Sequence, residues 1–125
     1  MPKGLTREQI LEAVDRIATP LKVPEWGDEP VYMTPMTTRE RERYERKLND
    51  AQPSETIRAE MAVLCVTDAD GERLFERSDI GALLERSAPA LERIFARGIR
   101  INLFTKEDVD ALLGGSEADA RGSGA

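Results

Sequence analysis

One block of the sequence, residues 58–75, constrains the fold more than any other. It reads RAEMAVLCVTDADGERLF, which is an apolar run, then a turn, then a second short apolar run. At its start, apolar side chains recur at spacings of four, three and one residues, at Ile57, Met61, Leu64 and Cys65. This period predicts an amphipathic helix over residues 54–66, capped by Ser54, that forms the centre of the core.

The second half of the block predicts a turn with no chemistry of its own. Asp68–Gly71 holds residue types that favour turns and left-handed backbone, and Leu74 and Phe75 are then expected to pack back onto the core. A calcium loop of the usual kind needs glycine at its sixth position, whereas glycine is the fourth residue here. The block therefore supplies packing and a turn, and offers no nucleophile or base.

Helix-start signals divide the rest of the chain into short helices. Capping boxes beginning at Thr6 and Thr37 predict a helix over residues 6–18 and a charged, solvated helix over residues 39–50. The first of these carries an apolar stripe formed by Ile10, Leu11, Val14 and Ile17. Three further short helices are predicted to start at Ser78-Asp79, Ser87 and Thr105. Gly98 either ends the middle one of these three or weakens it.

Four prolines between residues 20 and 35 forbid a continuous helix in that region. The β-prone runs Leu21–Val23 and Val31–Met33 predict a small hairpin or a pair of edge strands, because proline cannot donate to a strand ladder. Two such strands are not stable alone, so they must pack against the helices. The predicted fold class is therefore mainly α, of the α+β type: a small helical domain with a short N-terminal hairpin or edge strands.

The composition changes after residue 113. Residues 1–113 are expected to form a single domain, because a chain of 125 residues can bury only one modest core. Residues 114–125 are polar and rich in glycine, and their burial cannot offset the entropy lost on ordering. We expect them to form a flexible, disordered tail.

The composition also excludes several classes of function. Histidine is absent and Cys65 is the single cysteine, which removes the usual general base, the commonest zinc ligand and any internal disulfide. The sequence therefore predicts no enzyme, no cofactor and no metal. A net charge of −6 disfavours nucleic acid and anionic membranes, and no run approaches the roughly 18 apolar residues of a membrane span. We expect a cytoplasmic protein whose partners are other proteins.

The candidate partner-binding residues are Trp26, Tyr32, Met33 and Met36. A tryptophan flanked by prolines and adaptable methionines, in a non-helical segment, can form either a lid on the core or a patch that binds a partner. The unpaired edge of this β segment could also pair with a strand of a second copy. A homo-oligomer is therefore expected.

The order of several segments carries a family resemblance. A Thr-capped helix is followed by VPEWG at residues 23–27, MTTRERER at 36–43, AVLCVTDADGERLF at 62–75 and NLFTKEDV at 102–109. This order, over roughly residues 4–113, resembles that of the tail assembly chaperones of long-tailed bacteriophages. The resemblance rests on packing patterns, and the family has no catalytic motif.

The resemblance implies a non-enzymatic protein of the host cell cytoplasm that binds the tape measure protein. It would keep that protein soluble while the tail tube assembles, and would be absent from the mature virion. The tail tube protein and a longer, frameshifted form of the chain itself are further candidate partners. The alternative function is a small structural component of the virion, such as a head–tail connector or a minor tail protein.

Overall fold

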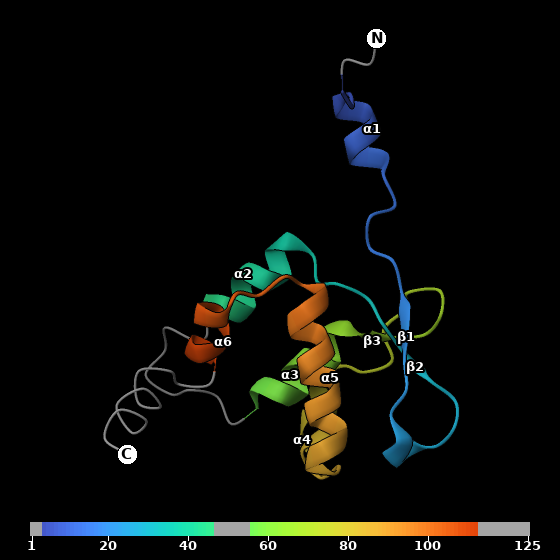
Figure 1. Cartoon of the computed structure of the whole chain (residues 1–125), viewed down its shortest axis with the longest axis vertical. Helices are drawn as coiled ribbons and strands as arrows, with labels where there is room; N and C mark the ends of the chain where they lie inside the picture. Colours follow the sequence, from blue (N-terminus) through green and yellow to red (C-terminus); the bar gives the residue numbers. More distant parts are fainter. Residues whose placement is uncertain (1–3, 47–55, 113–125) are drawn as a thin grey trace.

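A computed structural model of the chain describes residues 4–46 and 56–112 (Figure 1). It is mainly α with a small antiparallel sheet, which confirms the predicted fold class. The elements are α1 (Arg7–Glu12), β1 (Thr19–Leu21), the 3-10 turn η1 (Pro24–Trp26), β2 (Val31–Met33), α2 (Thr38–Arg46), α3 (Ile57–Cys65), β3 (Val66–Thr67), the 3-10 turn η3 (Arg77–Asp79), α4 (Ile80–Leu84), α5 (Ala88–Ile101) and α6 (Lys106–Leu112).

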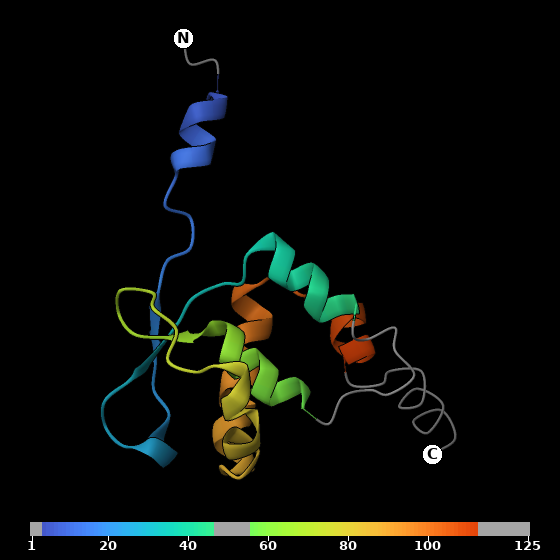
Figure 2. The ribbon, with the colours of Figure 1, turned by 180° about the vertical axis from the view of Figure 1, so that it is seen from behind.

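The core is built where α3 packs against α5, in the middle of the body (Figures 1 and 2). Helix α3 is buried on nearly every side, which confirms it as the central element. It starts at Ile57, and the predicted cap Ser54 lies outside the described residues. Gly98 neither ends nor interrupts α5 but lies buried inside it. The largest buried apolar side chains of the pair are Ile57, Met61, Leu91, Ile94 and Phe95.

The sheet has the strand order β1-β2-β3, and both pairs are antiparallel. The predicted hairpin is confirmed, with Thr19 opposite Met33, but its first strand is Thr19–Leu21 and not the predicted Leu21–Val23, because the chain enters the 3-10 turn at Val23. Strand β1 with its proline lies at an edge, as proline requires. The third strand was missed, because Val66 was assigned to the central helix. Its backbone turns to φ −78° and ψ 125° and pairs with Met33. A β-branched residue after the last helical turn adopts this geometry readily once a strand is available to pair with it.

The turn after β3 forms as predicted. The Oδ1 atom of Asp68 accepts hydrogen bonds from the amides of Asp70 and Glu72 at 2.8 and 3.0 Å, and Gly71 has φ +88°. Phe75 packs on the core, but the expectation that Leu74 does so is wrong, since its side chain is 51% exposed. The amide of Leu74 donates to the carbonyl of Val66, so this segment runs extended, and successive side chains point to opposite faces.

The N-terminal helix is shorter than predicted. Its capping box between Thr6 and Gln9 is present, but the helix ends at Glu12 rather than residue 18. Ala13 is extended, and α1 lies apart from the body at the end of a linker (Figures 1 and 2). Short helices owe most of their stability to tertiary packing, and α1 contains no buried residue. Its apolar stripe therefore does not prolong the helix.

The remaining helix starts are close to their predicted positions. Thr37, Ser87 and Thr105 each accept a hydrogen bond from the backbone amide three residues later. The start near Ser78 is instead capped by Glu76, whose amide in turn donates to Asp79 at 2.8 Å. The second helix is less solvated than predicted, because Tyr44 is buried and its hydroxyl donates to the carbonyl of Ile57 at 2.7 Å. The predicted end of that helix and the predicted tail, residues 114–125, lie outside the described residues.

Candidate partner-binding surfaces

The four predicted binding residues do not form one patch. Met33 and Met36 are buried members of the core. Tyr32 is half-buried in the middle of β2, where alternation along the strand places it on the face opposite Met33. Trp26 is also half-buried, and it lines a pocket. Of the four, Trp26 and Tyr32 thus keep exposed surface, and their role in binding stays a prediction.

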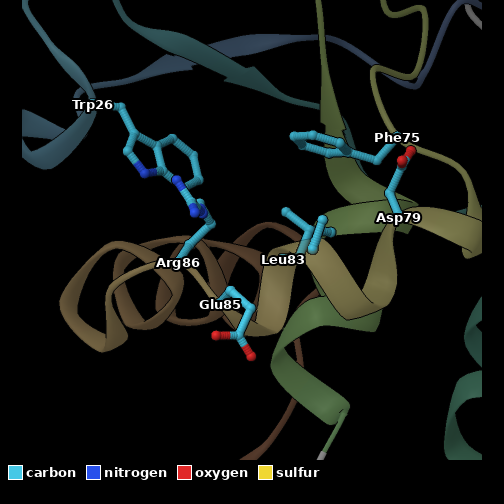
Figure 3. Close-up of a pocket in the computed structure, with 7 residues that line it drawn as sticks. Trp26, Phe75, Asp79, Leu83, Glu85 and Arg86 are labelled. Carbon is cyan, nitrogen blue, oxygen red and sulfur yellow. The ribbon is translucent and has the colours of Figure 1, made fainter.

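The Trp26 pocket is a cavity of about 690 Å³ between η1 and α4. The rings of Trp26 and Phe75 stand on opposite sides, with Leu83 between them at the base (Figure 3). Arg86 points toward Trp26, and Glu85 points away from both rings (Figure 3). An apolar floor with charged groups at the rim suits an apolar side chain of a partner whose flanks are polar. The residues that line the pocket are Trp26, Phe75, Asp79, Ala82, Leu83, Glu85 and Arg86.

Residues next to Trp26 in the sequence fix its position. Pro24 starts the 3-10 turn, the amide of Trp26 donates to the carbonyl of Val23 at 2.9 Å, and Gly27 leaves the turn at φ +123°. A two-point ion pair from Arg93 on α5 then fixes Glu25 of this turn, at 2.9 and 3.1 Å. The same hydrogen bonds lower the pKa of the Glu25 carboxyl below its ordinary value.

A second surface is the N-terminal arm, residues 4–18. Its apolar side chains, which belong to Leu5, Ile10, Leu11, Val14 and Ile17, are between 56% and 85% exposed. The arm rises from the end of the body at which α5 ends and α2 begins (Figures 1 and 2). Its root is tied there, because the Nε of Arg16 donates to the carbonyl of Pro35 at 2.9 Å. These exposed apolar groups make the arm a candidate contact surface.

Leu103 is the third exposed apolar feature, and no sequence signal pointed to it. The amides of Phe104 and Leu103 donate to the carbonyls of Ile99 and Arg100, which is the Schellman ending of a helix. Glycine usually occupies the left-handed position of this ending, but here it is Leu103, with φ +58°. A side chain in that conformation costs about 1 kcal/mol or more. The leucine gains little packing in return, because it is 80% exposed.

The described residues contain no group of three or more His, Cys, Asp or Glu side chains that could hold a metal ion. Burial raises the pKa of the Cys65 thiol to about 11, so the thiol stays protonated at neutral pH. No helix in the described part of the chain has the length and apolar character needed to span a bilayer.

These features define a small α+β module with several exposed apolar side chains. No family model matches the chain, and no curated protein matches its sequence. Among solved structures, the chain is similar to the tail assembly chaperone of bacteriophage HK97, with a TM-score of 0.57 and 15% sequence identity. The match covers 74% of this chain and 94% of the HK97 chain. The fold is thus that of a phage tail assembly chaperone, and the resemblance seen in the sequence is confirmed at this level.

Proposed function

We propose that this protein is a phage tail assembly chaperone whose client is the tape measure protein. The observation that carries the proposal is the shared fold, which extends over 94% of the HK97 chaperone. In this proposal the protein acts in the cytoplasm of the host cell, keeps the client soluble while the tail tube assembles, and leaves before the virion is complete. It performs no catalytic step.

The exposed apolar surfaces support this role. A client that is long, helical and apolar needs a chaperone with apolar contact surfaces on an acidic, soluble body, and this chain has both. Several copies along one client would strengthen the complex through multivalency. The proposal therefore includes self-association, and it keeps the tail tube protein and a frameshifted longer form as further partners.

Co-expression with the tape measure protein of the same phage tests the proposal. We expect the tape measure protein to become soluble and to co-purify with the chain. Mass spectrometry of purified virions separates the proposal from the alternative of a structural virion component. A chaperone is expected to be absent from the particles, and stoichiometric amounts in them would favour a connector or minor tail protein.

The Trp26 pocket is our proposed site for self-association. Truncation of an aromatic group that lines an apolar pocket usually weakens an interface more than truncation of a scattered surface residue. Trp26→Ala should therefore shift sedimentation toward smaller species. Leu84→Ala is the matched control, because Leu84 lies on α4 and is 45% exposed but does not line the pocket. Equal sedimentation of the two variants, with both folded by circular dichroism, would remove the pocket from the proposal.

A further inference from the structure

The two sides of the Trp26 pocket belong to different parts of the chain (Figure 3). One side is Trp26 of η1, and the other is formed by Phe75 and residues of η3 and α4. Turn η1 packs mainly on α5, whereas η3 and α4 pack mainly on α3. Within the described part of the chain, no hydrogen bond or ion pair crosses the pocket between these sides. The width of the pocket therefore depends on what holds η1 to α5.

Two arginines on α5 hold the segment that leads into η1. Arg93 and Arg97 are four residues apart, so they lie on the same face of the helix. Arg97 donates to the carbonyl of Pro20 at 3.1 Å. Arg93 forms the two-point ion pair with Glu25, at 2.9 and 3.1 Å. Residues 20–26 are thus fastened along α5 at two points, and we call this segment the strap.

The end of the strap that carries Trp26 depends on Arg93 more than on packing. Val23 is buried and anchors the middle of the strap, but η1 itself contains no buried residue. Among the described residues, the pair between Glu25 and Arg93 is the one hydrogen-bonded contact that joins η1 to the helices. Two parallel hydrogen bonds from a guanidinium fix the orientation of a carboxylate as well as its distance. Glu25 is therefore held in one orientation, and Trp26 follows it directly in the chain.

We propose that Arg93 is a positioning residue for the Trp26 pocket. Arg93 does not line the pocket. Through Glu25, however, it sets how far the indole of Trp26 stands from Phe75 and Leu83, and so how well the pocket receives a side chain of a second copy. This inference rests on the proposed function, because association of copies through the pocket is part of it. It adds a residue outside the interface that controls the shape of the interface.

The fluorescence of Trp26 tests the geometry directly, because the chain contains one tryptophan. Quenching by acrylamide measures the exposure of the indole, in protein dilute enough to sediment as a monomer. Arg93→Gln should raise the quenching constant toward its value in the urea-unfolded chain, while circular dichroism shows that the body stays folded. Arg100→Gln is the matched control, because Arg100 is an exposed residue of α5 that forms no ion pair with any described residue. This control should leave the quenching constant unchanged.

Exchange of the two charges separates positioning from general stability. Glu25→Arg alone and Arg93→Glu alone each place like charges side by side, so both should raise the quenching constant. The double variant, Glu25→Arg with Arg93→Glu, restores an ion pair in the reversed sense and should return the constant toward the wild-type value. If Arg93 served only stability, the single variants would lower the Tm and leave the quenching of the folded chain unchanged.

Sedimentation over a range of concentrations then measures the association of copies. Arg93→Gln should weaken it by about two- to fivefold, the range expected when a partly exposed ion pair is lost. The double charge exchange should recover it, and Arg100→Gln should associate like the wild type. Trp26→Ala provides the reference for loss of the pocket wall itself.

The results distinguish this inference from the proposed function. If quenching in folded Arg93→Gln equals that of the wild type, the inference is wrong, whatever the state of association. If Trp26→Ala weakens association but Arg93→Gln does not, the pocket joins copies and the inference is again wrong. If the wild type does not associate, but quenching rises in Arg93→Gln and returns in the charge exchange, self-association is wrong and the positioning of Trp26 by Arg93 stands.

Discussion

Gly98 on α5 lies so close to Met61 on α3 that a Cβ atom at residue 98 would be 2.5 Å from the Sδ atom of Met61. Real Cβ atoms do not approach that closely, so the two helices can pack at their present distance only because residue 98 has no side chain. Met61 has no exposed surface into which it could move. The lack of a side chain at Gly98 thus permits the close approach of the two central helices.

Gly98→Ala should therefore destabilise the protein, although the same change inside a helix normally stabilises by about 0.5–1 kcal/mol. Overpacking typically costs about 1–3 kcal/mol, and we expect the net loss to be about 1 kcal/mol. Urea unfolding measures it. Gly81→Ala on α4 is the matched control, because its new Cβ would meet nothing within 4 Å. A stabilising Gly98→Ala would contradict the packing of α3 on α5.

Asn102→Ala should destabilise the protein by about 1–3 kcal/mol. The buried Asn102 amide donates to the carbonyl of Gly98 at 2.8 Å and accepts from the amide of Met36 at 2.7 Å. The substitution leaves the Met36 amide without this partner in a buried position. Chemical denaturation measures the loss, and a change below about 0.5 kcal/mol, typical of an ordinary surface position, would argue against this role.

The native protein should resist thiol reagents at pH 8. Cys65 is fully buried, and burial raises the pKa of its thiol to about 11, so little thiolate forms and access is blocked. We expect no measurable reaction with Ellman's reagent over minutes and one equivalent of reaction in denaturant. Rapid labelling of the folded chain would indicate that the α3 core opens easily.

Stability should fall as the pH drops below about 4.5, the ordinary pKa of glutamate. Burial acts to raise the pKa of Glu40, but hydrogen bonds from Arg73 and from Thr37 outweigh it and lower the pKa. The unfolded chain then binds more protons than the folded chain near that pH. The stabilisation is complete above the unfolded pKa and is lost as the pH falls through the folded pKa.

Urea midpoints measured from pH 6 down to pH 3 test this expectation. Glu40→Gln should flatten the decrease in midpoint because it removes the titrating carboxyl, and Arg73→Gln should flatten it because it removes the ion pair that lowers the pKa of that carboxyl. The double variant should behave like Glu40→Gln, since no carboxyl is left for Arg73 to affect. The pKa values of Glu25 and Asp108 are lowered as well, by hydrogen bonds from Arg93 and from Thr105 respectively. Part of the decrease should therefore persist in every variant. An unchanged slope in both single variants would rule out a contribution from Glu40.

The helix caps were predictable because they depend on near neighbours alone. Thr6, Thr37, Ser87 and Thr105 each bond to an amide three residues away, so no distant residue is needed to form them. The edge position of β1 was predictable for a similar reason, since the missing amide of Pro20 is a property of one residue.

The candidate surfaces were less predictable. The sequence predicted Trp26 as a partner-binding residue together with two methionines, but both methionines are buried in the core. Phe75 and Leu83 complete the Trp26 pocket from segments about fifty residues away in the sequence. Leu103 gave no signal at all, because its left-handed backbone follows from how α5 ends and not from its residue type.

The sequence by itself determined the mainly α class, the starts of most helices, the turn after Asp68 and the lack of histidine chemistry, since each depends on composition or on residues a few positions apart. Only the tertiary structure decided that Val66 joins a strand, that the apolar stripe of the arm stays exposed, and that Leu103 faces solvent. These outcomes depend on which surfaces meet across long sequence separations. A local pattern of apolar residues shows that a surface must be covered, but not whether the body or a partner covers it.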